Sequence, residues 1–219
     1  MDKLDRLVWA DGFSFISYGV RIGVRINERA QLARVLSCLP PGWQRTTSTR
    51  VDRLYSVVAG GEGSRPNLKL LNLVYANANR LARTSSFDDA LDALESDLQL
   101  FVAEEAPRRL FVHAGVVAWK GKAALIPGRS FSGKTSLVAE LVKRGATYYS
   151  DEYAVLDAEG HVHNYARPLS IRENGQLAKP TRLDARASAV ARQHDADIAG
   201  VEPTAVALTE QLRAARDLK

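Results

Sequence analysis

The sequence has almost no cysteine and no long apolar run. Cys38 is the only cysteine among 219 residues, so the chain can form neither an internal disulfide nor a cysteine-based metal site. No apolar stretch approaches the roughly 20 residues that span a bilayer. The start, MDKLDRLVWADGF, lacks the apolar segment of a secretion signal. We therefore expect a cytoplasmic protein with no membrane partner.

Positive charge is only slightly in excess of negative charge. The formal net charge is +5, which suits an anionic ligand. The arginines are spread along the whole chain, and no nucleic-acid-binding motif accompanies them, so we expect no nucleic-acid partner. With 46% hydrophobic and 25% charged residues, the composition is that of one large or two small globular domains.

Residues 1–107 predict a small α+β N-terminal domain without a chemical signature. Apolar and polar residues alternate with the period of two that is typical of half-buried strands. We regard this domain as a candidate region for recognising a substrate or partner. The expected strands cover residues 20–26, 51–59 and 68–75.

Two helices are expected in the same region. Asn27 is placed to cap a helix that must end at Pro40. Ser86 and Asp89 have the spacing of a capping box, and the helix that they begin is expected to end at Pro107.

Residues 108–219 contain a motif with a defined chemistry. PGRSFSGKT lies between an apolar hairpin, expected over 110–118 and 122–127, and a helix expected over 136–145. It matches G-x-x-x-x-G-K-[ST], in which backbone N–H groups wrap phosphates, lysine reaches the β/γ oxygens and the hydroxyl ligates Mg²⁺. We expect the lysine at a solvated helix start. The predicted ATP- and Mg²⁺-binding residues are Gly128, Arg129, Ser130, Phe131, Ser132, Gly133, Lys134, Thr135 and Ser136.

Carboxylates follow the next apolar segment. A strand expected over 147–150 leads to Asp151 and Glu152, where a nucleotide-binding sheet places acids near Mg²⁺. Arg167 and Arg172, further along, are candidates for a second phosphate grip. Acidic pairs and arginines are also common on solvated surfaces, so both interpretations stay open.

Two histidines stand apart from this motif. His161 and His163 lie on one face of an expected strand, at a spacing that could bind a metal ion. No third ligand is evident in the sequence, so we expect no metal site there.

The stretch from His113 to Glu152 resembles the catalytic domain of HPr kinase/phosphorylase and its relatives. That family shares a nucleotide site with the ATP-dependent phosphoenolpyruvate carboxykinases. A histidine-bearing strand, a turn, a second strand, the glycine-rich loop, a helix ending in KRG and an acidic pair follow one another in the family's order. The resemblance implies an α/β P-loop kinase domain of HPr-kinase type with a mixed sheet.

The resemblance also implies roles for individual residues. Lys134 and Thr135 would bind ATP and Mg²⁺, one acid would be the base, the other would help with the metal, and His113 would support the base. We assign Asp151 as the base and Glu152 as the metal ligand, because aspartate has the shorter reach. The family's pair is usually Asp-Asp, and its N-terminal domain is longer, so the chain looks closer to shorter HPr-kinase-like proteins, including kinases of lasso-type ribosomal peptides.

Three functions are compatible with these residues. The first is an ATP/Mg²⁺-dependent kinase acting on a hydroxyl, serine above all, of a protein, peptide or small molecule. The second is a nucleotide-binding regulatory switch that transfers no phosphate, and the third is a carboxykinase-like enzyme. The polar stretch from residue 178 to 203 leaves few strands to complete the sheet, so a homo-oligomer is a candidate for supplying an edge.

Overall fold

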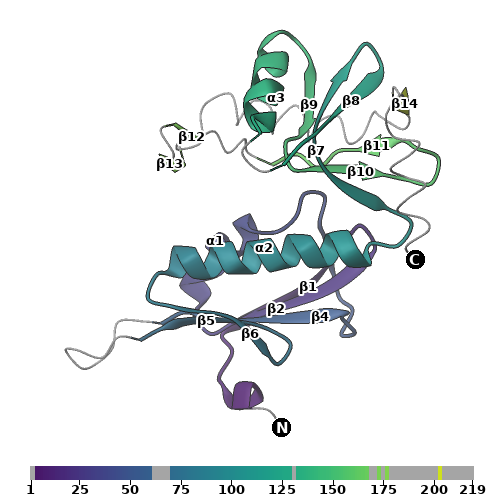
Figure 1. Ribbon diagram of the computed structural model, residues 1–219. Coiled ribbons are helices and arrows are strands. Elements are labelled where there is room, and N and C mark those ends of the chain that lie inside the picture. The colour runs from purple at the N-terminus through teal and green to yellow at the C-terminus, as the bar shows by residue number, and fades with distance from the viewer. Residues whose placement is uncertain are drawn as a thin grey trace. The chain divides into compact units, whose positions relative to one another are not determined.

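The computed structural model describes residues 3–60, 70–129 and 132–167, and the short strands at 172–173, 176–177 and 202–203. The chain divides into two compact units, Met1–Pro107 and Arg108–Lys219. Both are α/β, with antiparallel and mixed sheets (Figure 1). Among the helices described, none is both long enough and apolar enough to cross a bilayer.

The first unit is built on a six-stranded sheet in the order β3-β1-β2-β4-β5-β6. Its neighbours pair antiparallel except β2 and β4, which run parallel. The strand expected over 20–26 is confirmed as β2, and those expected over 51–59 and 68–75 are β4 and β5 with shifted ends. The strands are β1 (Asp11–Ser17), β2 (Val20–Ile26), β3 (Gln44–Thr46), β4 (Arg53–Val58), β5 (Asn72–Ala76) and β6 (Asn79–Thr84).

The long helix α2 (Phe87–Glu105) lies along one face of this sheet (Figure 1). The expected cap is confirmed, because the Ser86 hydroxyl accepts a hydrogen bond of 3.3 Å from the Asp89 amide. Asp97 joins the helix to β4 by accepting from the Tyr55 hydroxyl at 2.7 Å and from Arg53 at 2.9 Å. Burial of the apolar stripe and this polar bridge fix α2 against the sheet.

The prediction that Asn27 caps a helix is wrong. The helical segments before Pro40 are η2 (Arg29–Gln31), whose N-cap is Glu28, and α1 (Leu32–Ser37); a further 3-10 turn, η1 (Lys3–Arg6), precedes β1. The Asn27 side chain instead exchanges two hydrogen bonds with the backbone of Ala59, of 2.7 and 3.1 Å. Asn27 follows β2 beside β4, where both halves of its amide find partners at once.

The second unit contains a sheet in the order β11-β10-β7-β8-β14, with β9 also paired to β7. The hairpin of β7 and β8 and the strand expected over 147–150 are confirmed. β14 pairs parallel with β8. The elements are β7 (Leu110–Trp119), β8 (Lys122–Pro127), α3 (Lys134–Lys143), β9 (Thr147–Ser150), β10 (Tyr153–Leu156), β11 (Val162–His163), β12 (Arg172–Glu173), β13 (Gln176–Leu177) and β14 (Glu202–Pro203).

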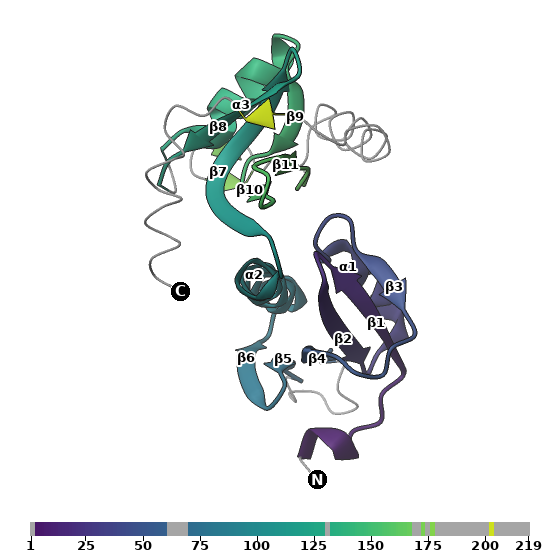
Figure 2. The ribbon, with the colours of Figure 1, turned by 90° about the vertical axis from the view of Figure 1, so that its right-hand side faces the viewer.

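The pairing of β7 explains where this unit brings its loops together. β8 and β9 both run antiparallel to β7, on its opposite edges, so they are parallel to each other. The helix α3 connects β8 and β9 and lies beside the sheet (Figure 2). Its Val138 and Ala139 pack against Val117 and Tyr148. Because parallel strands end on the same side of a sheet, the loop after β8 and the residues after β9 meet.

Candidate functional site

The loop between β8 and α3 depends on two glycines. A Cβ at Gly128 would lie 2.5 Å from the Ser132 hydroxyl and 3.3 Å from the Lys134 side chain, so a larger residue there would push the loop side chains away. Gly133 is the N-cap of α3 and has a φ of +87°, in the left-handed region that glycine tolerates best. The loop therefore closes tightly over the first turn of α3, where helix N–H groups favour an anion.

Lys134 is buried within this loop. The residue is only 7% exposed, and its ammonium donates to the carbonyls of Gly128 at 2.7 Å and of Arg129 at 2.8 Å. The expectation of a solvated lysine at the helix start is therefore wrong. The loop folds back over the lysine stem, and its carbonyl oxygens satisfy the charge.

Thr135 and Asp151 contact each other across the end of the sheet. The Thr135 hydroxyl lies 3.2 Å from Oδ2 of Asp151. Oδ1 of the same carboxylate accepts from the Tyr148 hydroxyl at 2.9 Å, and Tyr148 also contacts the Arg167 carbonyl at 2.8 Å. Burial, followed by the Asp151 charge, raises the pKa of Tyr148 above its usual range, so the phenol stays protonated and donates.

A β-bulge brings Tyr148 to the same side as Asp151. Residues three apart on a regular strand point to opposite faces of the sheet. Here the register with β7 shifts between Val116 and Val117, which pairs Tyr148 with Val117 and Ser150 with Val116. The shift reverses the alternation, so Tyr148 can reach the carboxylate. This role of Tyr148 could not be predicted from the sequence, because a bulge leaves no local signature in TYYSDE.

Glu152 and His113 complete the charged cluster. Glu152 is exposed, but partial loss of solvation and then the neighbouring Asp151 carboxylate raise its pKa, and the Lys134 charge partly opposes them. His113 is exposed on β7, and partial loss of solvation and the Lys134 charge lower its pKa, against the effects of the Glu152 carbonyl and of Asp151. Glu152 also accepts a backbone hydrogen bond of 3.1 Å from Ala114, beside His113 on β7. The structure thus gathers a lysine, a hydroxyl, two carboxylates and a histidine at one end of the sheet.

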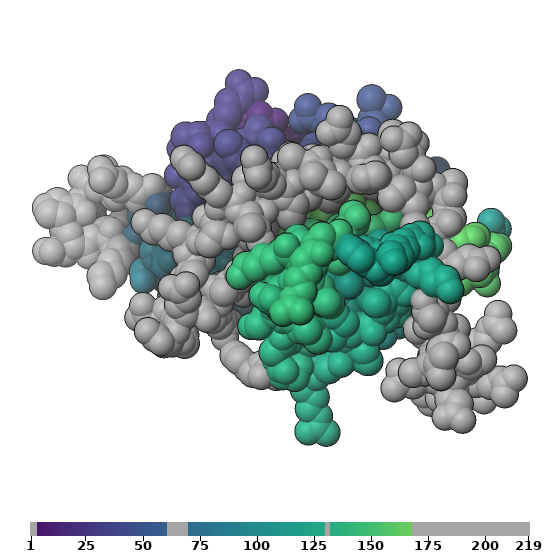
Figure 3. All heavy atoms as spheres, turned by 90° about the horizontal axis from the view of Figure 1, so that it is seen from above, coloured from purple at the N-terminus to yellow at the C-terminus, as the bar shows by residue number. Residues whose placement is uncertain are grey.

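The other residues predicted to bind ATP or phosphate are less closely tied to this cluster. Arg129, Ser132 and Ser136 are exposed on the loop and first turn of α3, whereas Ser130 and Phe131 lie outside the described residues. Arg167 meets the cluster through its backbone carbonyl. Arg172 lies on β12, and its side chain is outside the described part of the structure. Figure 3 shows the face of this unit that carries α3 and the β7–β8 hairpin, in teal and green.

Comparison with known proteins finds no relative. No protein-family model matches the chain, and no curated protein and no solved structure matches it. The resemblance to HPr kinase/phosphorylase accordingly stays a prediction that rests on residues 113–152.

Proposed function

We propose that the chain is an ATP- and Mg²⁺-dependent kinase of HPr-kinase type, which transfers the γ-phosphoryl group to a hydroxyl, serine above all, of a protein or peptide. The observation that carries this proposal is the contact between the Thr135 hydroxyl and the Asp151 carboxylate, directly beside Lys134. In P-loop enzymes a hydroxyl and an acid in this relation hold the metal ion next to the phosphates.

The loop offers the groups that a triphosphate requires. Lys134 is held by two carbonyl oxygens of the loop. Phosphate oxygens are stronger partners for an ammonium group and would replace them when ATP binds. The first turn of α3 adds N–H groups and partial positive charge.

The contacts favour Asp151 as the metal ligand and Glu152 as the base, which is the reverse of our sequence-based assignment. Asp151 contacts the Thr135 hydroxyl, which suits a metal-binding role, and carboxylate and hydroxyl oxygens are the ligands that Mg²⁺ prefers. Bound there, Mg²⁺ would supply charge neutralisation at the phosphates. Tyr148 orients the same carboxylate from its other oxygen.

Glu152 then becomes the base. The pKa of Glu152 is raised toward neutral pH, and a general base works best when its pKa is near the working pH. Glu152 would take the proton of the acceptor hydroxyl as its oxygen attacks phosphorus, while the bond from phosphorus to the ADP oxygen breaks. His113, whose lowered pKa keeps it neutral, would support Glu152 without adding a competing positive charge.

The test combines binding with transfer. Calorimetric titration with Mg-ATP measures the nucleotide site, and intact-mass analysis of copurifying or genetically adjacent proteins and peptides detects an added phosphoryl group. We expect Lys134→Ala to abolish nucleotide binding. Glu152→Gln should keep ATP affinity but lower transfer by ~10²–10⁴-fold, as for loss of a general base.

Each alternative gives a different result. No ATP binding by the unaltered chain would overturn the nucleotide site. Tight binding without transfer to any acceptor would favour the regulatory switch, and transfer to a small hydroxyl compound alone would favour a small-molecule kinase. If Asp151→Asn rather than Glu152→Gln preserves ATP affinity and stops transfer, Asp151 is the base.

A further inference from the structure

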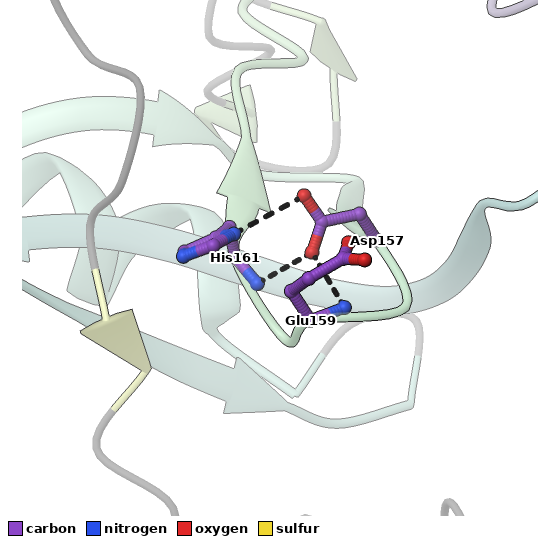
Figure 4. A group of neighbouring side chains, drawn as sticks. All are labelled: Asp157, Glu159 and His161. Atoms are coloured by element: carbon purple, nitrogen blue, oxygen red, sulfur yellow. Dashed lines mark hydrogen bonds and ion pairs between the residues drawn. The ribbon is translucent and has the colours of Figure 1, made fainter.

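The turn between β10 and β11 gathers metal-ligating side chains outside the kinase cluster. A carboxylate oxygen of Asp157, one of Glu159 and a ring nitrogen of His161 all lie within 4.8 Å of one another (Figure 4). No third ligand is evident in the sequence, whereas the structure places Asp157 and Glu159 beside His161. The turn folds the chain back, so that acids from before the histidines come to lie beside them.

This cluster is held in place by its surroundings. Oδ1 of Asp157 accepts from the amides of Glu159 at 3.1 Å and of His161 at 2.8 Å, which orients the carboxylate (Figure 4). Leu156 and Val162, at the two ends of the turn, are buried in the sheet core. The turn is thus anchored at both ends, and its ligand groups do not have to be ordered from a flexible loop.

The second oxygen of Asp157 faces both histidines. Oδ2 lies 3.4 Å from Nδ1 of His161 and 2.8 Å from Nε2 of His163. Two ligands of a tetrahedral zinc ion are about 3.3 Å apart, given metal–ligand bonds of about 2.0 Å. The separation between Asp157 and His161 therefore already has the size that one ion requires.

We propose that Asp157, Glu159 and His161 bind a divalent transition-metal ion, Zn²⁺ in the first instance, and that His163 positions the Asp157 carboxylate. An imidazole nitrogen combined with carboxylate oxygens suits Zn²⁺ and its neighbours, whereas Mg²⁺ and Ca²⁺ prefer oxygen alone. The ion would also neutralise two adjacent carboxylates that otherwise repel each other. The Asp157 and His161 side chains are 11% and 39% exposed, so an ion can enter from solvent.

The experiment uses the full chain, freed of metal with a chelator, in the absence of nucleotide. Calorimetric titration with Zn²⁺ should show one ion per chain, and the melting temperature should rise with Zn²⁺ concentration because the ion binds only the folded turn. Co²⁺ in place of Zn²⁺ should give the visible absorption of a nitrogen- and oxygen-ligated ion.

Substitutions of the proposed ligands test where the ion binds. His161→Ala and Glu159→Gln should each weaken Zn²⁺ binding by at least about tenfold, because each removes a ligand. Both side chains are at the surface, so the fold should persist, and circular dichroism checks this. Asp92→Asn, which changes an exposed carboxylate on α2, is the matched control and should bind Zn²⁺ as the unaltered chain does.

His163 is tested by a pair of substitutions. His163→Ala should weaken binding through Asp157, and His163→Gln, which can still donate to that carboxylate, should recover part of the loss. The proposal is overturned if Zn²⁺ does not bind, if His161→Ala and Glu159→Gln bind it unchanged, or if Asp151→Asn abolishes binding instead. A failure here leaves the proposed ATP site unaffected, because the two sites share no residue.

Discussion

The Thr135 hydroxyl lies 3.2 Å from Oδ2 of Asp151, although the two residues are sixteen positions apart in the chain. Thr135 is in the first turn of α3, and Asp151 directly follows β9. They meet because β8 and β9 run parallel on opposite edges of β7. A hydroxyl and a carboxylate in contact provide two hard oxygen ligands at a helix N-terminus, next to the only lysine of the loop.

Thr135→Val should weaken Mg²⁺-dependent ATP binding more than binding without metal. The substitution removes the hydroxyl and keeps the branched shape of the side chain. Titrations with and without Mg²⁺ measure the difference, and Thr135→Ser, which retains the hydroxyl, is the control. An equal loss in both conditions would indicate packing damage and contradict a metal-binding role.

Tyr148→Phe should lower the free energy of unfolding by about 1–3 kcal/mol, because the half-buried oxygens of Asp151 and Arg167 lose the hydroxyl donor that they share. Urea denaturation measures this loss. Tyr75→Phe, at a half-buried tyrosine of β5 in the first unit, is the control for removing a phenol hydroxyl.

The same substitution tests whether Tyr148 positions Asp151. We expect a greater Mg²⁺ requirement for transfer, because the carboxylate is free to rotate away from Thr135. A variant that is less stable but has an unchanged Mg²⁺ requirement would restrict Tyr148 to a structural role.

Glu152→Gln should stabilise the fold near neutral pH. Partial loss of solvation and the Asp151 charge raise the pKa of Glu152 in the folded chain, so the ionised group opposes folding above that pKa, though only weakly because the residue is exposed. The opposition fades as the pH falls below the ordinary carboxyl pKa of about 4.3, where both states are protonated. Melting temperatures should therefore differ most at about pH 7 to 8 and converge at about pH 4.

Glu140→Gln provides the comparison for that pH series. Glu140 is an exposed partner of Arg144 on the surface of α3, where ion pairs contribute little. We expect only a small change at either pH. A loss of stability in Glu152→Gln at neutral pH would contradict the raised pKa.

Gly115→Ala should destabilise the second unit by about 1–3 kcal/mol, as overpacking does. The new Cβ would lie 2.7 Å from Cγ2 of Val138, which packs α3 onto β7. Val138→Ala makes room, so the double variant should lose less stability than the two single losses added together. Additive losses in urea denaturation would show that the two positions are not in contact.

Several elements could be predicted from the sequence because their causes are local. The alternating residues of 20–26 form β2, and the Ser86 hydroxyl caps α2 at the Asp89 amide. The hairpin of β7 and β8 has a short turn with Lys120 and Gly121 at positive φ, as a two-residue connection requires. The same alternation is present in β1, where Phe13, Phe15 and Ser17 are the buried residues.

The sequence by itself determined which reactive groups are near one another along the chain: the loop with Lys134 and Thr135, the pair Asp151 and Glu152, and His161 with His163. The tertiary structure alone decided which of them meet. Tyr148 reaches Asp151 through a bulge, and Asp157 joins the histidines through a turn. Bulges and registers depend on the partner strand, which lies elsewhere in the chain, whereas strand period and helix caps depend on neighbouring residues.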